Sequence, residues 1–341
     1  PLINKGNTRK LRPTVYDLLA HRALDYFEND EKDITRSAHA FTINKNTAFD
    51  PATDFIHHTF ITKDTAALQY KALIIYRELL QFHSNDKDYA ALIDADLRRL
   101  QFVYRAAVIP DKDERYRLSL QHIAAQYEKI PAAAQASYLL AQYWYSKAEG
   151  YDKSKNEKDR HALKTAKNIC ETTVSKFPGT EGAANCQYLL NNILRKSLTL
   201  HTEKVNMPGE AFRSLVQYKN IERCYFRIIK IDNSLKDQLQ NRYEESYWSK
   251  LATQPAYRQW QQSLPAVEDY RDHSVEIKIG ALPVGEYALL ASVTENFGIQ
   301  NNLLAAQYFY ISAISYVNRE NAYFVLHRNT GKPLAGAAVQ V

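Results

Sequence analysis

Few residues in this chain have the types and spacing that a metal centre requires. His57 and His58 are the only adjacent histidines, and two imidazoles could ligate a metal ion, but no third ligand lies near them in the sequence. His83 and Asp86 flank the end of an expected helix, where capping explains them better than a functional site does. The sequence therefore predicts no metal site.

Signatures of catalysis are equally scarce. The sequence contains no GxSxG, HExxH, GxGxxG, P-loop or EF-hand motif. Glu244, Glu245 and Asp269 are read as ordinary surface carboxylates rather than as an acid/base pair. Glycine contributes only 10 of 341 residues, which argues against a nucleotide enzyme built on glycine-rich loops. We predict that the chain is not an enzyme and binds no cofactor; a hydrolase would need polar residues converging in a pocket.

Large aromatic residues recur at helical spacing, and they leave two interpretations open. They could fill the core and the contacts between helices, or they could line a groove that binds a peptide or a glycan. The residues concerned are Phe102, Tyr104, Tyr143, Trp144, Tyr145, Trp248 and Trp260.

Cysteine content and charge exclude several other classes. Cys170, Cys186 and Cys224 are too few for a disulfide framework and form no CxxC pair. Cys170 and Cys186 either form a disulfide, if neighbouring helices place them face to face, or remain buried thiols. The formal net charge is +6, and the densest basic stretch, 147–167, is interrupted by acidic residues. We therefore expect no nucleic-acid partner.

Helical periodicity dominates the first 200 residues. The segment 29–63 has no pattern and is long for a loop, so we expect that it either wraps a surface or is poorly ordered. The remaining pattern is that of consecutive amphipathic helices stacked as hairpins. The expected helices are 14–28, 64–83, 88–107, 113–128, 131–148, 159–176 and 181–200.

Near residue 205 the period changes from 3.6 to 2. Turn signals separate the alternating segments, which is typical of an antiparallel sandwich, and 234–262 reads as a helical insertion. The predicted fold class is therefore α+β in separate domains, an α-helical hairpin array followed by an antiparallel β-sandwich. The expected strands are 222–231, 275–279, 287–293, 308–314 and 323–327. The predicted domains are 1–204, 205–317 and the start of a second sandwich at 318–341.

One part of the helical region resembles a tetratricopeptide repeat. Matching positions in a first helix are Tyr138, Ala141, Gln142 and Tyr145, and those in a second helix are Ala166, Cys170, Thr173 and Pro178. The charged loop 149–158 separates the two helices by more than the standard repeat allows. The resemblance implies small residues where paired helices approach closely.

The β-region resembles macroglobulin-type domains of bacterial alpha-2-macroglobulin-like proteins, especially the large ones of the Bacteroidetes. In 282–293 a Pro-x-Gly turn leads into an alternating strand, and 323–341 contains Thr-Gly-Lys-Pro-Leu-Ala-Gly-Ala-x-Val, which looks like the hairpin that opens such a domain. Segments 80–86 and 94–97 also look like the helical N-terminal region of these proteins. The chain starts at Pro1 without a signal peptide and stops after an alternating pattern, so we expect both ends to be internal to a longer polypeptide.

This resemblance implies an exported protein, periplasmic or associated with the outer membrane, with any lipid anchor outside this fragment. Members of the family present a bait segment to proteases, and some trap them through a Cys-x-Glu-Gln thioester. None of the three cysteines fits that motif, and no functional residue can be transferred. The expected function is a non-enzymatic N-terminal scaffold with protein partners, either proteases or cell-envelope proteins. The alternative is a helical-repeat module that binds a peptide or glycan, with the sandwich as spacer.

Overall fold

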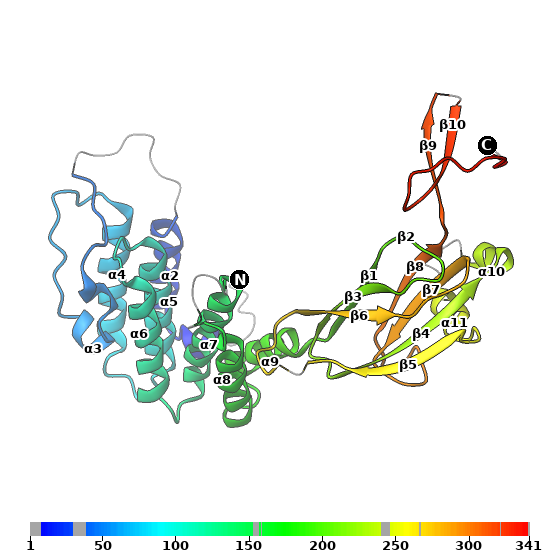
Figure 1. Cartoon of the computed structure of the whole chain (residues 1–341). Coiled ribbons are helices and arrows are strands. Elements are labelled where there is room, and N and C mark those ends of the chain that lie inside the picture. The colour runs from blue at the N-terminus through cyan, green and yellow to red at the C-terminus, as the bar shows by residue number, and fades with distance from the viewer. Residues whose placement is uncertain are drawn as a thin grey trace. The chain divides into compact units, whose positions relative to one another are not determined.

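The structure is a computed structural model that describes residues 8–29, 39–152, 157, 159–239, 246–265, 267–320 and 322–339. The chain divides into two compact units, Pro1–Ile193 and Leu194–Val341 (Figure 1). The first is helical and the second consists mainly of antiparallel strands, so the predicted fold class is confirmed. The boundary predicted near 204 falls inside the second unit.

All seven predicted helices of the first unit are present, with ends within four residues of the prediction except at one position, whereas the short helices at 8–11 and 52–55 were not predicted. The helix predicted for 181–200 ends at Leu194, because 197–202 form a strand. No described helix combines the length and the apolar composition that crossing a bilayer requires. The described helices are α1 (Thr8–Leu11), α2 (Val15–Phe27), α3 (Ala52–Phe55), α4 (Leu68–His83), α5 (Ala90–Ala106), α6 (Lys112–Gln126), α7 (Ala134–Glu149), α8 (Ala162–Lys176) and α9 (Glu181–Leu194), with 3₁₀ turns η1 (Asn46–Phe49) and η2 (Pro131–Ala133).

The described part of the patternless segment wraps the helices. Its side chains Ile43, Phe49 and Phe55 are buried in the core that α4, α5 and α6 share. Arg99, which is fully buried, fixes this wrapping. Its guanidinium donates to Asp96 at 2.8 Å and to the carbonyls of residues 48 and 50 at 2.6 and 2.9 Å, and it lies over the Phe55 ring.

The close approach of α9 to α7 depends on a glycine. A Cβ on Gly182 would lie closer than 3.0 Å to the carbonyl carbon of Ala134, well inside van der Waals contact. The backbone of α9 can therefore approach the start of α7 only where the side chain is a hydrogen atom.

The second unit contains a sandwich of two sheets. A three-stranded sheet has the order β1-β3-β6, and a five-stranded sheet has the order β2-β8-β7-β4-β5. All the pairs are antiparallel except β2 with β8. Apolar side chains from both sheets, among them Val216, Phe226 and Leu289, fill the space between them. These strands are β1 (Ser197–Thr202), β2 (Val205–Asn206), β3 (Phe212–Lys219), β4 (Arg223–Ile231), β5 (Arg258–Ser263), β6 (His273–Ile279), β7 (Gly285–Ser292) and β8 (Leu304–Ile311).

The predicted helical insertion is right in its first part and wrong at its end. Helices α10 (Asn233–Gln238), through Leu235, and α11 (Ser246–Ala252), through Tyr247 and Leu251, pack with β-strand residues on the second face of the five-stranded sheet. Residues 258–263 instead form β5, an edge strand paired with β4. Trp260 stacks on Phe226 there, with ring centroids 5.3 Å apart, so an aromatic contact across strands fixes the segment.

The last two strands form a sheet of their own. β9 (Ile314–Arg319) pairs with β10 (Ala322–His327), and neither strand belongs to a sandwich sheet. The segment predicted as one strand over 308–314 is therefore divided, because β8 ends at Ile311 and β9 begins at Ile314. Gly331 adopts φ +65 in the turn after β10, a conformation that favours glycine.

Candidate functional site

The histidines and carboxylates considered from the sequence lie in separate places. His58 Nε2 lies 2.7 Å from Asp50 Oδ2, and Asp269 contacts the His273 ring at 2.8 Å. Glu244 and Glu245 lie outside the described residues. No group of three or more potential ligands that could hold a metal ion occurs among the described residues.

The three cysteines are free and buried, which answers the question that the sequence left open. Cys170 in α8 and Cys186 in α9 interact side chain to side chain as thiols. Burial raises the pKa of Cys224, in β4, to about 12. A buried thiol of that kind is a poor nucleophile.

The aromatic residues divide between the two interpretations. Phe102 is buried beside Tyr76, and Trp248 and Trp260 pack in the β-unit. Tyr104 and Tyr143, in contrast, line a cavity of about 570 Å³ in the helical unit. Core packing therefore explains Phe102, Trp248 and Trp260. Tyr104 and Tyr143 also pack against the core of the helical unit, so both interpretations hold for these two.

This cavity adjoins a second one of about 430 Å³, because Arg98, Gln101 and Leu139 line both. Residues at successive turns on one face of α5 line one side of the two cavities, and residues on one face of α7 line another side. We call the two cavities together the α5–α7 groove. From α5 it is lined by Ala90, Ile93, Asp94, Leu97, Arg98, Gln101, Tyr104 and Arg105, and from η2 and α7 by Pro131, Ala132, Gln135, Leu139, Gln142, Tyr143, Ser146 and Lys147.

At the first cavity, charged and aromatic groups hold one another in place. Tyr104 stacks on Tyr116 with centroids 4.4 Å apart and rings 7° from parallel. The Lys147 ammonium donates to Asp113, and this hydrogen bond lowers the pKa of that carboxyl. Burial, followed by the nearby Asp113, raises the pKa of Tyr104. The tyrosine therefore stays a neutral hydroxyl.

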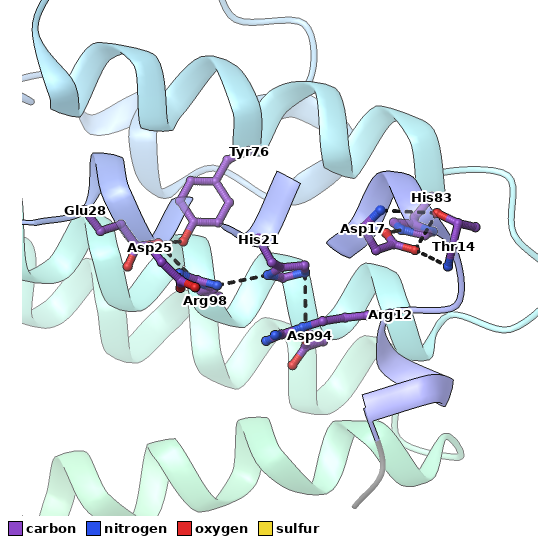
Figure 2. Close-up of polar contacts among 10 residues, drawn as sticks. All are labelled: Arg12, Thr14, Asp17, His21, Asp25, Glu28, Tyr76, His83, Asp94 and Arg98. Carbon is purple, nitrogen blue, oxygen red and sulfur yellow. Dashed lines mark hydrogen bonds and ion pairs between the residues drawn. The ribbon is translucent and has the colours of Figure 1, made fainter. Parts of the chain in front are cut away.

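Helix α2 reaches the groove through Glu28, the residue just after its last turn (Figure 2). The Glu28 carboxylate accepts hydrogen bonds from the Tyr76 hydroxyl, from Arg98 Nε at 3.0 Å and from Arg105 Nη2 at 3.1 Å. Arg98 also donates to Asp25 at 2.7 Å. Two of the groove's cations are thus positioned by a carboxylate that both of them share.

The same face of α2 carries a buried histidine. His21 Nδ1 lies 3.0 Å from an Arg98 donor, which makes this nitrogen an acceptor and the ring neutral. Burial, followed by the charges of Arg12 and Arg98, lowers the pKa of His21 to about 4. Its Nε2 is 4.0 Å from Asp94 Oδ2, and burial raises the pKa of that carboxyl.

A second histidine, His83, contacts the first turn of α2. The His83 ring lies between two carboxylates, with Nε2 2.6 Å from Asp17 and Nδ1 2.6 Å from Asp86. Asp17 also closes a capping box with Thr14. Burial alone would raise the pKa of Asp17, but the hydrogen bonds from His83 and Thr14 outweigh it and lower the pKa. His83 therefore connects α4 to α2 and also contacts Asp86, three residues beyond the end of α4.

The groove is lined by polar groups of several kinds. They are amides, hydroxyls, carboxylates and cations, and Arg98, Arg105 and Lys147 among the cations are ion-paired. Sequence reasoning missed its charged residues, since charges that far apart form no motif; they are Glu28, Arg98, Arg105 and Lys147. The one available signal was the spacing of Asp17, His21 and Glu28, which places polar groups on the same face of α2.

Comparison with known proteins gives little further information. No protein-family model matches the sequence, and no curated protein matches it. Among solved structures, a match is native alpha-2-macroglobulin from Escherichia coli in a crystal structure spanning domains MG0-NIE-MG1, with a TM-score of 0.31 and 12% sequence identity. The match covers 41% of this chain and 48% of that one, so about half of the neighbour's length is spanned. A similarity this weak carries no argument about function.

Proposed function

We propose that this chain is a non-enzymatic scaffold and interaction portion of an alpha-2-macroglobulin-like protein of the cell envelope, serving protease inhibition or defence. The proposal takes its family from the resemblance of 282–293 and 323–341. Export to the periplasm or the outer membrane is part of it, with proteases or envelope proteins as partners. The observation that carries the scaffold role is the separate sheet of β9 and β10.

That sheet has apolar side chains on both faces. Tyr316 lies opposite Val325, and Val317 lies opposite Phe324, so the two pairs are on opposite faces of the hairpin. Tyr316, Val317 and Phe324 are all exposed. A two-stranded hairpin is only marginally stable alone, and clustered exposed apolar side chains mark an interaction surface. These features support a hairpin that completes a further β-domain.

Hydrogen exchange tests the scaffold role. In this chain, the amides of β10 should exchange faster than those of β7, which is paired on both sides within the sandwich. In the longer protein that the proposal assumes, β10 should become protected while β7 stays unchanged as the internal control. Equal protection of β10 and β7 in the present chain would count against the proposal.

The second candidate function is binding by the helical unit, and the α5–α7 groove favours it. The groove brings tyrosines, amides and cations together on two helix faces, which is the arrangement expected for capturing a peptide or a glycan. Probing the whole chain against peptide and glycan arrays tests this function. Binding to neither kind of array would refute it.

A further inference from the structure

The first cavity of the groove is lined by three cations and one carboxylate, and two carboxylates outside the lining pair with its cations, Asp25 with Arg98 and Asp113 with Lys147. Arg98, Arg105 and Lys147 line it together with one carboxylate, that of Glu28. Glu28 already accepts three hydrogen bonds, so little of its acceptor capacity is left for a ligand. The Arg105 side chain is 62% exposed and uses one of its five donor hydrogens in a hydrogen bond to Glu28. An incoming carboxylate would therefore meet available donors.

The second cavity is balanced. Its lining contains three cations, Lys10, Arg12 and Arg98, and three carboxylates, Asp88, Asp94 and Glu181. A preference for negative charge should therefore be confined to the end of the groove that Arg105 and Lys147 occupy.

Uncharged polar side chains lie between the cations. Gln101, Gln142 and Ser146 make no side-chain hydrogen bond to any other residue that the structure describes. A glutamine amide can donate and accept at the same time, which matches the alternating N–H and C=O groups of a polypeptide backbone.

The length of the groove suits a short extended segment. Its lining on α5 runs from Ala90 to Arg105, which corresponds to about 22 Å at 1.5 Å per residue. An extended chain advances about 3.3 Å per residue, so this length accommodates six or seven residues.

The tyrosines argue against a sugar as the ligand. Carbohydrate recognition would use the open face of an aromatic ring, but Tyr104 is stacked on Tyr116 and has the Lys112 ammonium 5.7 Å from its centroid. Tyr143 has the Lys147 ammonium 5.4 Å from its centroid and makes a T-shaped contact with the Trp144 ring. A sugar would have to displace these neighbours before it could stack.

We infer that the α5–α7 groove binds an extended segment of about six residues from a partner protein, with an acidic side chain in the first cavity. This inference rests on the second function proposed above. The acidic side chain adds a charge-assisted hydrogen bond to Arg105, the amides of Gln101 and Gln142 contact the segment's backbone, and the second cavity accepts uncharged residues.

The inference is tested by probing an array of immobilised hexapeptides with the whole chain. In the array each peptide position is fixed in turn as Glu, Gln or Lys. Glu at one terminal position should strengthen binding about tenfold over Gln, and Lys there should weaken it. The variant Arg105→Gln should lose this preference. Arg213→Gln is the matched control, because Arg213 is also an exposed arginine with an ion pair to one carboxylate, Glu276, and lies in the other unit.

The outcomes separate the inference from the function on which it rests. Equal binding of Glu and Gln peptides, or a Glu preference that survives Arg105→Gln, overturns the acidic ligand. Binding to glycans without binding to hexapeptides also overturns it, yet leaves a binding function for the helical unit. Binding to neither overturns both. Circular dichroism of each variant confirms that the helices are intact.

Discussion

Replacing His21 with asparagine should change how the stability of the helical unit depends on pH. The His21 ring is buried and neutral, accepts a hydrogen bond from Arg98 and has a pKa lowered to about 4. Asparagine keeps an acceptor near the position of Nδ1 but cannot be protonated in this range. On acidification the wild-type protein should therefore lose stability through protonation of His21 in the unfolded state, a loss that His21→Asn does not share.

The size of the effect follows from proton linkage. In the unfolded chain histidine titrates near its ordinary pKa of 6.5, so between pH 6.5 and about 4 the unfolded state takes up a proton that the native state does not. Stability is therefore lost as the pH falls through that window. From pH 7 to pH 4.5 the full shift corresponds to about 2.4 kcal/mol, and partial solvent screening reduces this to about 2 kcal/mol.

The difference in free energy of unfolding between wild type and His21→Asn is measured by urea unfolding at pH 7, 5.5 and 4.5. Circular dichroism at 222 nm follows the transition, because the helices dominate that signal. Whatever stability the substitution costs at pH 7, the gap between variant and wild type should shrink by about 2 kcal/mol at pH 4.5. Other groups, such as Asp17, titrate in both proteins and largely cancel from the comparison. A gap independent of pH would refute the neutral, desolvated state of His21, as would an imidazole that titrates near 6.5 by NMR.

Three other expectations follow from buried groups. Arg99→Met should destabilise the helical unit by about 3–5 kcal/mol in urea unfolding, because it leaves the buried Asp96 carboxylate without its cation, whereas the exposed Arg22→Met should cost under about 0.5 kcal/mol. Gly182→Ala should lower the free energy of unfolding by about 1–3 kcal/mol in thermal unfolding, because the new Cβ would clash with α7. Gly150→Ala is the tolerant control, since a Cβ there would have no neighbouring atom closer than 3.9 Å. The cysteines should resist a thiol reagent in the native protein and all react in guanidinium; rapid native labelling would contradict their burial.

Periodicity predicted most of the helices but failed where two patterns coincide. Ile193, Leu194 and Leu198 continue the helical stripe of α9, so the sequence favoured helix through residue 200. Leu198 and Leu200 are also two apart, and both are buried in the sandwich as part of β1. Pairing with β3, which is distant in sequence, decides between the patterns, and a local window cannot detect it.

The candidate site was predictable only in its aromatic part. Tyr104 and Tyr143 stood out by residue type, and the alternative of a groove was already open for them. Arg105 did not, because an isolated exposed cation has no distinguishing signal in a sequence, and Lys147 was noted only as the start of the densest basic stretch. Their importance comes from convergence on the same cavity, which depends on how α5 and α7 pack.

Helix α2 shows why amphipathicity alone could not orient the elements around the groove. Its exposed face carries Val15, Leu19 and Tyr26, at 70%, 62% and 67% exposure, whereas Asp17 and His21 are buried. The buried face also carries the apolar residues Ala20 and Leu24, so it mixes polar and apolar side chains in a way that amphipathicity does not predict. This orientation is stable because each buried polar group has a charged or hydrogen-bonding partner on α4 or α5. The same orientation brings Glu28 to Arg98 and Arg105, so the face that breaks the hydrophobic pattern is also the one that positions the cations of the groove.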